Sequence, residues 1–181
     1  MFRTSVLRQH GIKYSSEYPH AEDYELWLRM SRVTQMANIP EFLLRYRLHD
    51  SNISKIEFNT QDQLSIRIRK LFFTEAGIDV TDQDADLFRR LNYFDNTFTM
   101  SELQQLSSLL MSLLNCANTT NYFSAFELRT LLTDKWYHLC TNHSYHGGFI
   151  WKLYQSTPVL KNKKTTLIEV LKLRLKTWLK K

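Results

Sequence analysis

The chain has 181 residues, a formal net charge of +6 at pH 7 and 43% hydrophobic residues, a globular composition with enough apolar content for a core. It contains no run near the ~20 apolar residues that a membrane-spanning helix needs, and its two cysteines form no CxxC pair or disulfide framework. Because only four glycines and three prolines interrupt it, the sequence predicts a mainly α fold.

The basic charge favours a polyanionic neighbour: nucleic acid, an anionic membrane face or a phosphate-bearing ligand. No nucleic-acid-binding motif accompanies the charge, so we expect no nucleic-acid partner. The first residues, Met1 to Tyr14, lack the long apolar core of a signal peptide. Together with the cysteine usage, this leads us to expect a cytoplasmic location.

The first part of the chain, up to about Ser54, mixes element types. Helices are expected at Arg3 to Gln9 and at Ala21 to Arg32, where apolar residues recur at helical spacing. After Pro40, which the interior of a helix does not accommodate, the alternation of apolar and charged residues from Phe42 to His49 predicts a strand.

From Asn59 onward the pattern is almost continuously helical, with caps and glycines marking the ends. The further expected helices are Asn59 to Ala76, one capped by Thr81 through Tyr93, one capped by Ser101 to about Ala117, Tyr122 to Cys140, one after Gly147-Gly148, and Lys163 to the end.

Glu22 and Asp23 form an acidic pair in the first turn of the second expected helix. A general base must be ionised and must point at the hydroxyl that it deprotonates, and a carboxylate at a helix start meets both conditions. The alternative is that the pair only complements the helix dipole, which is the commoner role of acidic residues at such a position.

Arg47 and His49 lie on the charged face of the expected strand. A guanidinium binds phosphate oxygens bidentately and a neutral imidazole ligates divalent cations, so the two would suit a metal-bound diphosphate. The alternative is a solvated polar face of an edge strand.

The two segments together resemble a known enzyme family. AEDYELWLRM at Ala21 to Met30 precedes NIPEFLLRYRLH at Asn38 to His49, and Met1-Phe2-Arg3 and Ser54 stand at the expected places before and after them. This order and spacing resemble the C-terminal part of the catalytic domain of the family-two inverting glycosyltransferases with the GT-A fold. The resemblance covers roughly the first 54 residues.

The resemblance implies a fold and an activity. We expect residues 1–58 to be the C-terminal part of a GT-A catalytic domain, a short α/β remnant with one or two strands. A helical C-terminal region would follow at residues 59–181. The implied reaction transfers a sugar from a nucleotide-diphosphate donor to a saccharide or lipid-linked acceptor, in bacterial surface polysaccharide or lipopolysaccharide biosynthesis.

The resemblance also implies roles for four residues. Asp23 matches the base that deprotonates the acceptor hydroxyl, with Glu22 as its neighbour. Arg47 would lie near the leaving diphosphate. His49 matches the histidine that helps to hold a divalent metal, Mg²⁺ or Mn²⁺, in the complete enzyme.

The nucleotide-binding half of a GT-A domain, which ends in an aspartate-rich metal motif, is not found within these 181 residues. Asp82, Asp84 and Asp86 lie downstream of the acidic pair, in the wrong order for that motif, and fit a helix start instead. We therefore expect the isolated chain to have little or no transfer activity.

The C-terminal segment, Lys163 to Lys181, combines lysines with an apolar stripe and Trp178. It suits either peripheral contact with an anionic membrane, here the inner face of the cell membrane, or packing on the preceding helices. This leaves a second function, a non-catalytic helical protein that binds an anionic membrane or a protein partner. The cluster of His138, Cys140, His143 and His146 matches no zinc pattern, and we expect a loop with surface histidines.

Overall fold

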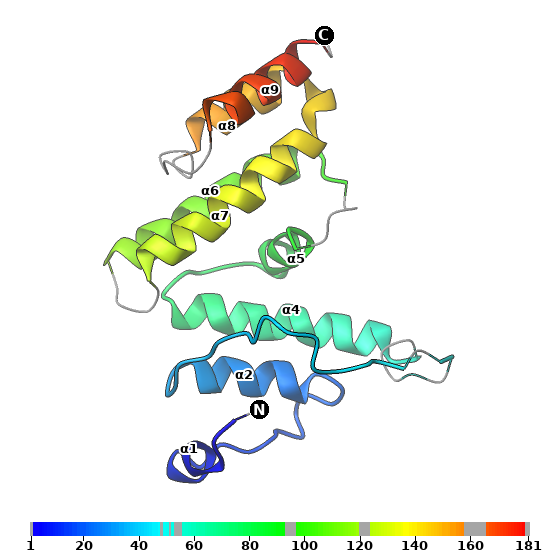
Figure 1. Cartoon of the computed structure of the whole chain (residues 1–181), viewed down its shortest axis with the longest axis vertical. Helices are drawn as coiled ribbons and strands as arrows, with labels where there is room; N and C mark the ends of the chain where they lie inside the picture. The colour runs from blue at the N-terminus through cyan, green and yellow to red at the C-terminus, as the bar shows by residue number, and fades with distance from the viewer. Residues whose placement is uncertain are drawn as a thin grey trace. The chain divides into compact units, whose positions relative to one another are not determined.

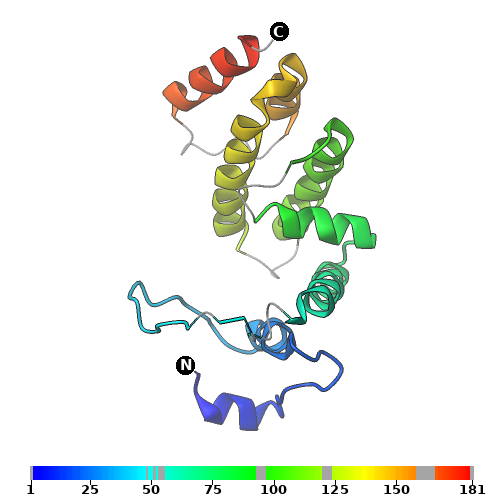
Figure 2. The ribbon, with the colours of Figure 1, turned by 90° about the vertical axis from the view of Figure 1, so that its right-hand side faces the viewer.

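The computed structural model describes residues 2–47, 49, 50, 52, 56–92, 97–119, 124–157 and 166–179. These residues are mainly helical, as the sequence predicts. The chain divides into two compact units, Met1–Phe72 and Phe73–Lys181. The division falls inside a helix, whereas the change of sequence texture lies near residue 58. Figures 1 and 2 show the helices of each unit.

The first unit contains α1 (Thr4–Gln9), α2 (Glu22–Ser31) and most of α4 (Phe58–Glu75). One face of α2 buries Leu26 and Met30 against Ile12, with Leu7 of α1 packed beside them. A second cluster joins the turn before α2 to α4; its buried members are Tyr18, Ala21 and Ile68. Helices α1 and α2 begin and end within about one residue of the predicted bounds.

The expected strand from Phe42 to His49 is not formed. Residues 42–47 are neither helix nor strand, and Leu48 lies outside the described residues. A strand is stabilised by a ladder of hydrogen bonds to a neighbour, and no residue described in this chain is in a strand. Without that partner the alternating pattern leaves its apolar residues in water, and Phe42 and Leu44 are almost fully exposed.

The second unit contains α5 (Asp82–Arg90), α6 (Met100–Thr119), α7 (Ala125–Asn142), the 3₁₀ turn η1 (Ser144–His146), α8 (Gly148–Ser156) and α9 (Leu167–Trp178). Helix α6 packs on α5 and α7, and α8 packs on α7 and α9 (Figure 1). The core of the second unit is built mainly from leucines at helical spacing on α6, together with the fully buried Trp136 of α7 and Ile150 of α8.

Helix caps in the second unit follow the sequence with one exception. Thr81 and Asp84 form a reciprocal capping box at α5, as do Thr166 and Glu169 at α9. At α6 the sequence points to Ser101, but the Oγ1 of Thr99 accepts the Glu102 N–H at 3.2 Å. The Glu102 carboxylate in turn accepts the Thr99 N–H at 2.7 Å. The capping residue is therefore the one that stands three positions before a glutamate.

Three predicted helix limits, Tyr93, Tyr122 and Lys163, lie outside the described residues. The expectation of surface histidines is wrong for His143, which is 2% exposed. Within the described residues, none of the helices combines the length and apolar character needed to cross a bilayer.

Candidate functional site

The start of α2 is held by contacts to the preceding turn and to α4. His20 has a positive φ of 66°, a conformation that few residues other than glycine adopt. Its carbonyl oxygen accepts a hydrogen bond from the Nε2 of Gln61 at 2.9 Å. Ala21 is the N-cap and offers no side-chain cap, so the first turn of α2 has backbone N–H groups that its own acidic residues can approach.

Asp23 is exposed in this first turn. Its Oδ1 accepts the backbone N–H of Tyr24 at 2.7 Å. That contact is the helix-start role that acidic residues commonly take. It engages one carboxylate oxygen, and among the residues that the structure describes Asp23 has no cationic partner. The side chain is therefore accessible to a ligand hydroxyl.

Glu22 differs from its neighbour in exposure. It is half-buried, and its Oε2 is fully buried without a hydrogen-bond partner among the described atoms. Glu22 precedes Leu26 by four residues, which places it on the face of α2 that packs into the core. Of the two predicted carboxylates, Asp23 is the more exposed to solvent.

Glu25 and Arg29 form a bidentate ion pair that sequence reasoning did not single out. The Nε and Nη2 of Arg29 donate to the two carboxylate oxygens of Glu25 at 2.5 and 2.7 Å. Nη2 also donates to the carbonyl of Lys13 at 2.6 Å. The hydrogen bond to Glu25 raises the pKa of Arg29 even though burial opposes it. The sequence signal was a glutamate four residues before an arginine on one helix.

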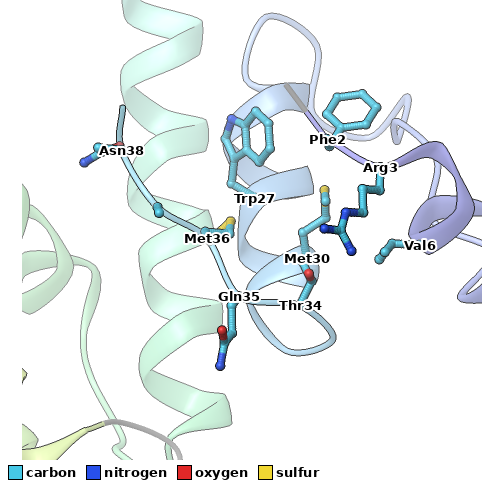
Figure 3. Close-up of a pocket in the computed structure, with 10 residues that line it drawn as sticks. Phe2, Arg3, Val6, Trp27, Met30, Thr34, Gln35, Met36 and Asn38 are labelled. Carbon is cyan, nitrogen blue, oxygen red and sulfur yellow. The ribbon is translucent and has the colours of Figure 1, made fainter. Parts of the chain in front are cut away.

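A groove of about 780 Å³ lies beside α2. The residues that line it come from the first residues of the chain, from α2 and from the segment after α2: Phe2, Arg3, Val6, Trp27, Met30, Thr34, Gln35, Met36, Ala37 and Asn38. Trp27 lies between Phe2 and the 34–38 segment (Figure 3). The Phe2 and Trp27 rings meet edge to face with centroids 6.2 Å apart.

The groove adjoins Asp23 along the helix. Asp23, Trp27 and Met30 are spaced by four and three residues, so they lie on one face of α2. Asp23 is therefore one turn before the wall formed by Trp27. The side chain of Trp27 is 37% exposed and lines the groove. An aromatic ring beside polar groups is typical of small-ligand sites.

Arg47 and His49 are placed by a different segment. Both are exposed, and both lie on a turn organised by the buried Asn52. The Nδ2 of Asn52 donates to the carbonyl of Arg47 at 3.3 Å, and its backbone N–H donates to the carbonyl of His49 at 3.3 Å. These contacts shape the backbone of the turn and leave the Arg47 side chain in solvent.

The four predicted residues thus form two pairs. Glu22 and Asp23 stand together at the start of α2, and Arg47 and His49 share the Asn52 turn. None of the four is among the residues that line the groove. The described part of the chain contains no cluster of three or more His, Cys, Asp or Glu residues able to hold a metal ion. His49 therefore does not by itself form the metal site that the resemblance implies.

Comparisons with known proteins give one informative match. Over 84 residues the chain is 33% identical to a protein of Haemophilus influenzae named as an uncharacterized glycosyltransferase. The match covers 44% of this chain and 26% of that relative, so the chain spans about a quarter of the relative's length. No family model and no solved structure matches. The similarity supports a glycosyltransferase relationship for the matched part of the chain.

Proposed function

We propose that this chain contributes the acceptor side of an inverting family-two glycosyltransferase of the GT-A type. The reaction would transfer a sugar from a nucleotide-diphosphate donor to a saccharide or lipid-linked acceptor in bacterial surface polysaccharide or lipopolysaccharide biosynthesis. The observation that carries the proposal is the exposed Asp23 at the start of α2, one turn from Trp27 and the groove. The relative named as a glycosyltransferase supports the same class of reaction.

In this proposal Asp23 acts as the general base. The acceptor hydroxyl oxygen attacks the anomeric carbon of the donor, and its proton passes to the Asp23 carboxylate. The new carbon–oxygen bond forms as the bond from the anomeric carbon to the diphosphate oxygen breaks, which inverts the anomeric configuration. The electron pair leaves with the diphosphate, whose oxygens suit the planar guanidinium of Arg47.

The remaining residues support this arrangement. The ion pair of Glu25 and Arg29 ties the Lys13 loop to α2 and so fixes the helix that carries Asp23. Glu22 acts through its position beside Asp23 rather than as the base, since its carboxylate is partly buried. His49 would serve as one ligand of a divalent metal only together with ligands that the described residues do not group with it.

The test is a pair of isosteric substitutions in an intact enzyme that contains this segment. Asp23→Asn is expected to lower kcat by about 10²–10⁴-fold, the usual contribution of a general base, with KM for the donor little changed. Glu22→Gln, the matched control, is expected to have a much smaller effect. Equal losses in both variants would contradict the assignment of the base. Turnover of nucleotide sugars by the isolated 181-residue chain would contradict the expected dependence on a nucleotide-binding half.

A second function is favoured by the helix α9. Its outer face is apolar and exposed, which suits a non-catalytic protein that binds an anionic membrane. Membrane contact alone is also compatible with sugar transfer, because a chain held at the inner face of the cell membrane would have a lipid-linked acceptor within reach.

A further inference from the structure

Helix α9 has two apolar faces, of which one is buried. Leu173 is fully buried and Thr177 is 3% exposed, on the side that packs against η1, α7 and α8. The hydroxyl of Tyr137 donates to the carbonyl of Glu169 at 3.4 Å, which attaches the start of α9 to α7. In both ribbon views no described helix of this unit covers the other side of α9 (Figures 1 and 2).

The second apolar face lies in solvent. Its members are large apolar side chains with exposed fractions between 56% and 83%: Leu167, Ile168, Leu171, Leu175, Trp178 and, at the C-cap, Leu179. At about 3.6 residues per turn, these positions fall within about a third of the helix circumference. The six side chains together form the outer stripe of α9. So continuous an exposed stripe of leucine and tryptophan contributes nothing to the packing of a monomer, and such apolar patches mark interaction surfaces.

Cations border the outer stripe on both sides. Lys172 and Lys176 lie along one edge, on the helical positions next to the stripe. Arg174 lies along the other edge, with its guanidinium 5.5 Å from the centre of the Trp151 ring on α8. The one carboxylate of α9, Glu169, lies beyond the lysine edge and is engaged by the N–H of Thr166 at 2.7 Å. The surface that the stripe offers is therefore apolar in the middle and positive at its borders.

This charge pattern indicates which kind of partner binds the outer stripe. A second copy of the chain packed stripe to stripe would bring the cations of one copy close to those of the other, which opposes association. An anionic lipid surface accepts both features, because acyl chains take up the leucines and lipid phosphates pair with the lysines. Trp178, near the end of the helix, has the amphipathic ring that is enriched at the headgroup level.

We propose that the outer stripe of α9 docks on an anionic membrane surface, with α9 parallel to the plane of the bilayer. The apolar side chains enter the headgroup and upper acyl region, while Lys172, Lys176 and Arg174 remain among the phosphates. The proposal does not depend on sugar transfer, since it concerns a surface of the second unit. Its failure would therefore leave the assignment of Asp23 untouched.

The contribution of the apolar side chains to membrane binding is tested by flotation of the full chain with vesicles of phosphatidylcholine and phosphatidylglycerol. The chain is expected to bind these vesicles and not vesicles of phosphatidylcholine alone. Leu171→Ser with Leu175→Ser is expected to lower the partition coefficient by about tenfold or more, from the loss of apolar contact. The matched control is Leu131→Ser on α7, a leucine of similar exposure at 52%, which is expected to leave binding unchanged. Equal binding by all three proteins would overturn the proposal.

The contribution of the cations to membrane binding is tested with the double variant Lys172→Gln, Lys176→Gln. Each cation near an anionic surface contributes about fivefold to binding, so loss of the pair is expected to reduce binding about 25-fold and to weaken its salt dependence. Sedimentation of the chain without vesicles tests for the competing occupant of the stripe, a second copy of the chain. Self-association that disappears in the leucine variant would assign the stripe to a second copy and overturn the membrane proposal. Circular dichroism of each variant verifies that the helices are retained.

Discussion

The core of the second unit encloses its large side chains more fully than the core of the first unit does, although α9 carries its outer stripe in solvent. In the second unit, Trp136 is fully buried and the α6 leucines pack against it and its neighbours. In the first unit, Trp27 is partly open to a groove and Phe42 is in solvent. A helical unit can satisfy its backbone locally and close its core with side chains, whereas an isolated extended segment needs a partner strand. The apolar side chains of residues 42–47 are in solvent because the described residues offer no partner strand.

The sharpest test of this contrast compares one tryptophan from each unit. Trp136→Ala is expected to cost about 3–5 kcal/mol of unfolding free energy, because it leaves a large cavity in the second unit. Trp27→Ala is expected to cost roughly 1 kcal/mol, since Trp27 is 37% exposed and loses mainly its contact with Phe2. Equilibrium urea unfolding of both variants measures the difference. Equal costs would show that the first unit is as tightly packed as the second.

His143 supplies a second test, because it is a buried titratable group in the second unit. Its Nδ1 donates to the carbonyl of Leu139 at 2.9 Å, and its Nε2 accepts the N–H of Phe98 at 3.0 Å. The contact with Phe98 requires the neutral ring, because a protonated Nε2 cannot accept a hydrogen bond, whereas the contact with Leu139 is open to either form of the ring and opposes the lowering of the pKa. Burial lowers the pKa of His143, and the neighbouring His146 adds to this effect. The Arg90 guanidinium, which lies over the Phe98 ring at 4.4 Å, adds a further positive charge to this region.

The sign of the expected pH effect follows from the lowered pKa. Below the ordinary value of 6.5, the unfolded chain binds a proton at this position that the folded chain does not, so stability falls as the pH drops. One proton limits the slope to ~1.4 kcal/mol per pH unit. Urea unfolding at pH values from 7 to 5 measures this slope. His143→Gln, which cannot titrate, is expected to be less stable at pH 7 and to show a flatter profile. An unchanged profile would contradict this role of His143.

Helices and their ends were predictable because their signals are local. The spacing of Leu26 and Met30, the Thr81 cap and the glycine that ends α4 each act within one or two turns. The alternation at residues 42–47 predicted a strand that is not formed, since a ladder depends on a neighbour far away in sequence, which the alternation itself does not reveal. The burial of His143 depends on Phe98, whose backbone lies on another part of the unit, so the local histidine pattern gave no sign of it.

The same distinction applies to the candidate site. The position of Asp23 in the first turn of α2 follows from helix signals close by, and the structure has it exposed there. The difference in burial between Asp23 and Glu22 follows from the helical spacing of Glu22 and Leu26, which is also a local signal. The groove was not predictable, because it forms where residues 2–6, α2 and residues 34–38 meet.

The smallest expected effect concerns Phe42, and it tests the unpaired segment directly. Phe42 is completely exposed, so Phe42→Ser removes no packing from the isolated chain and is expected to change the unfolding free energy by less than ~0.5 kcal/mol. If the segment pairs as a strand in the complete enzyme proposed above, burial of Phe42 there is expected to make the substitution cost about 2 kcal/mol or more. Urea unfolding of both proteins measures the two values. A large cost in the isolated chain would mean that residues 42–47 pack in solution, and the contrast between the units would then disappear.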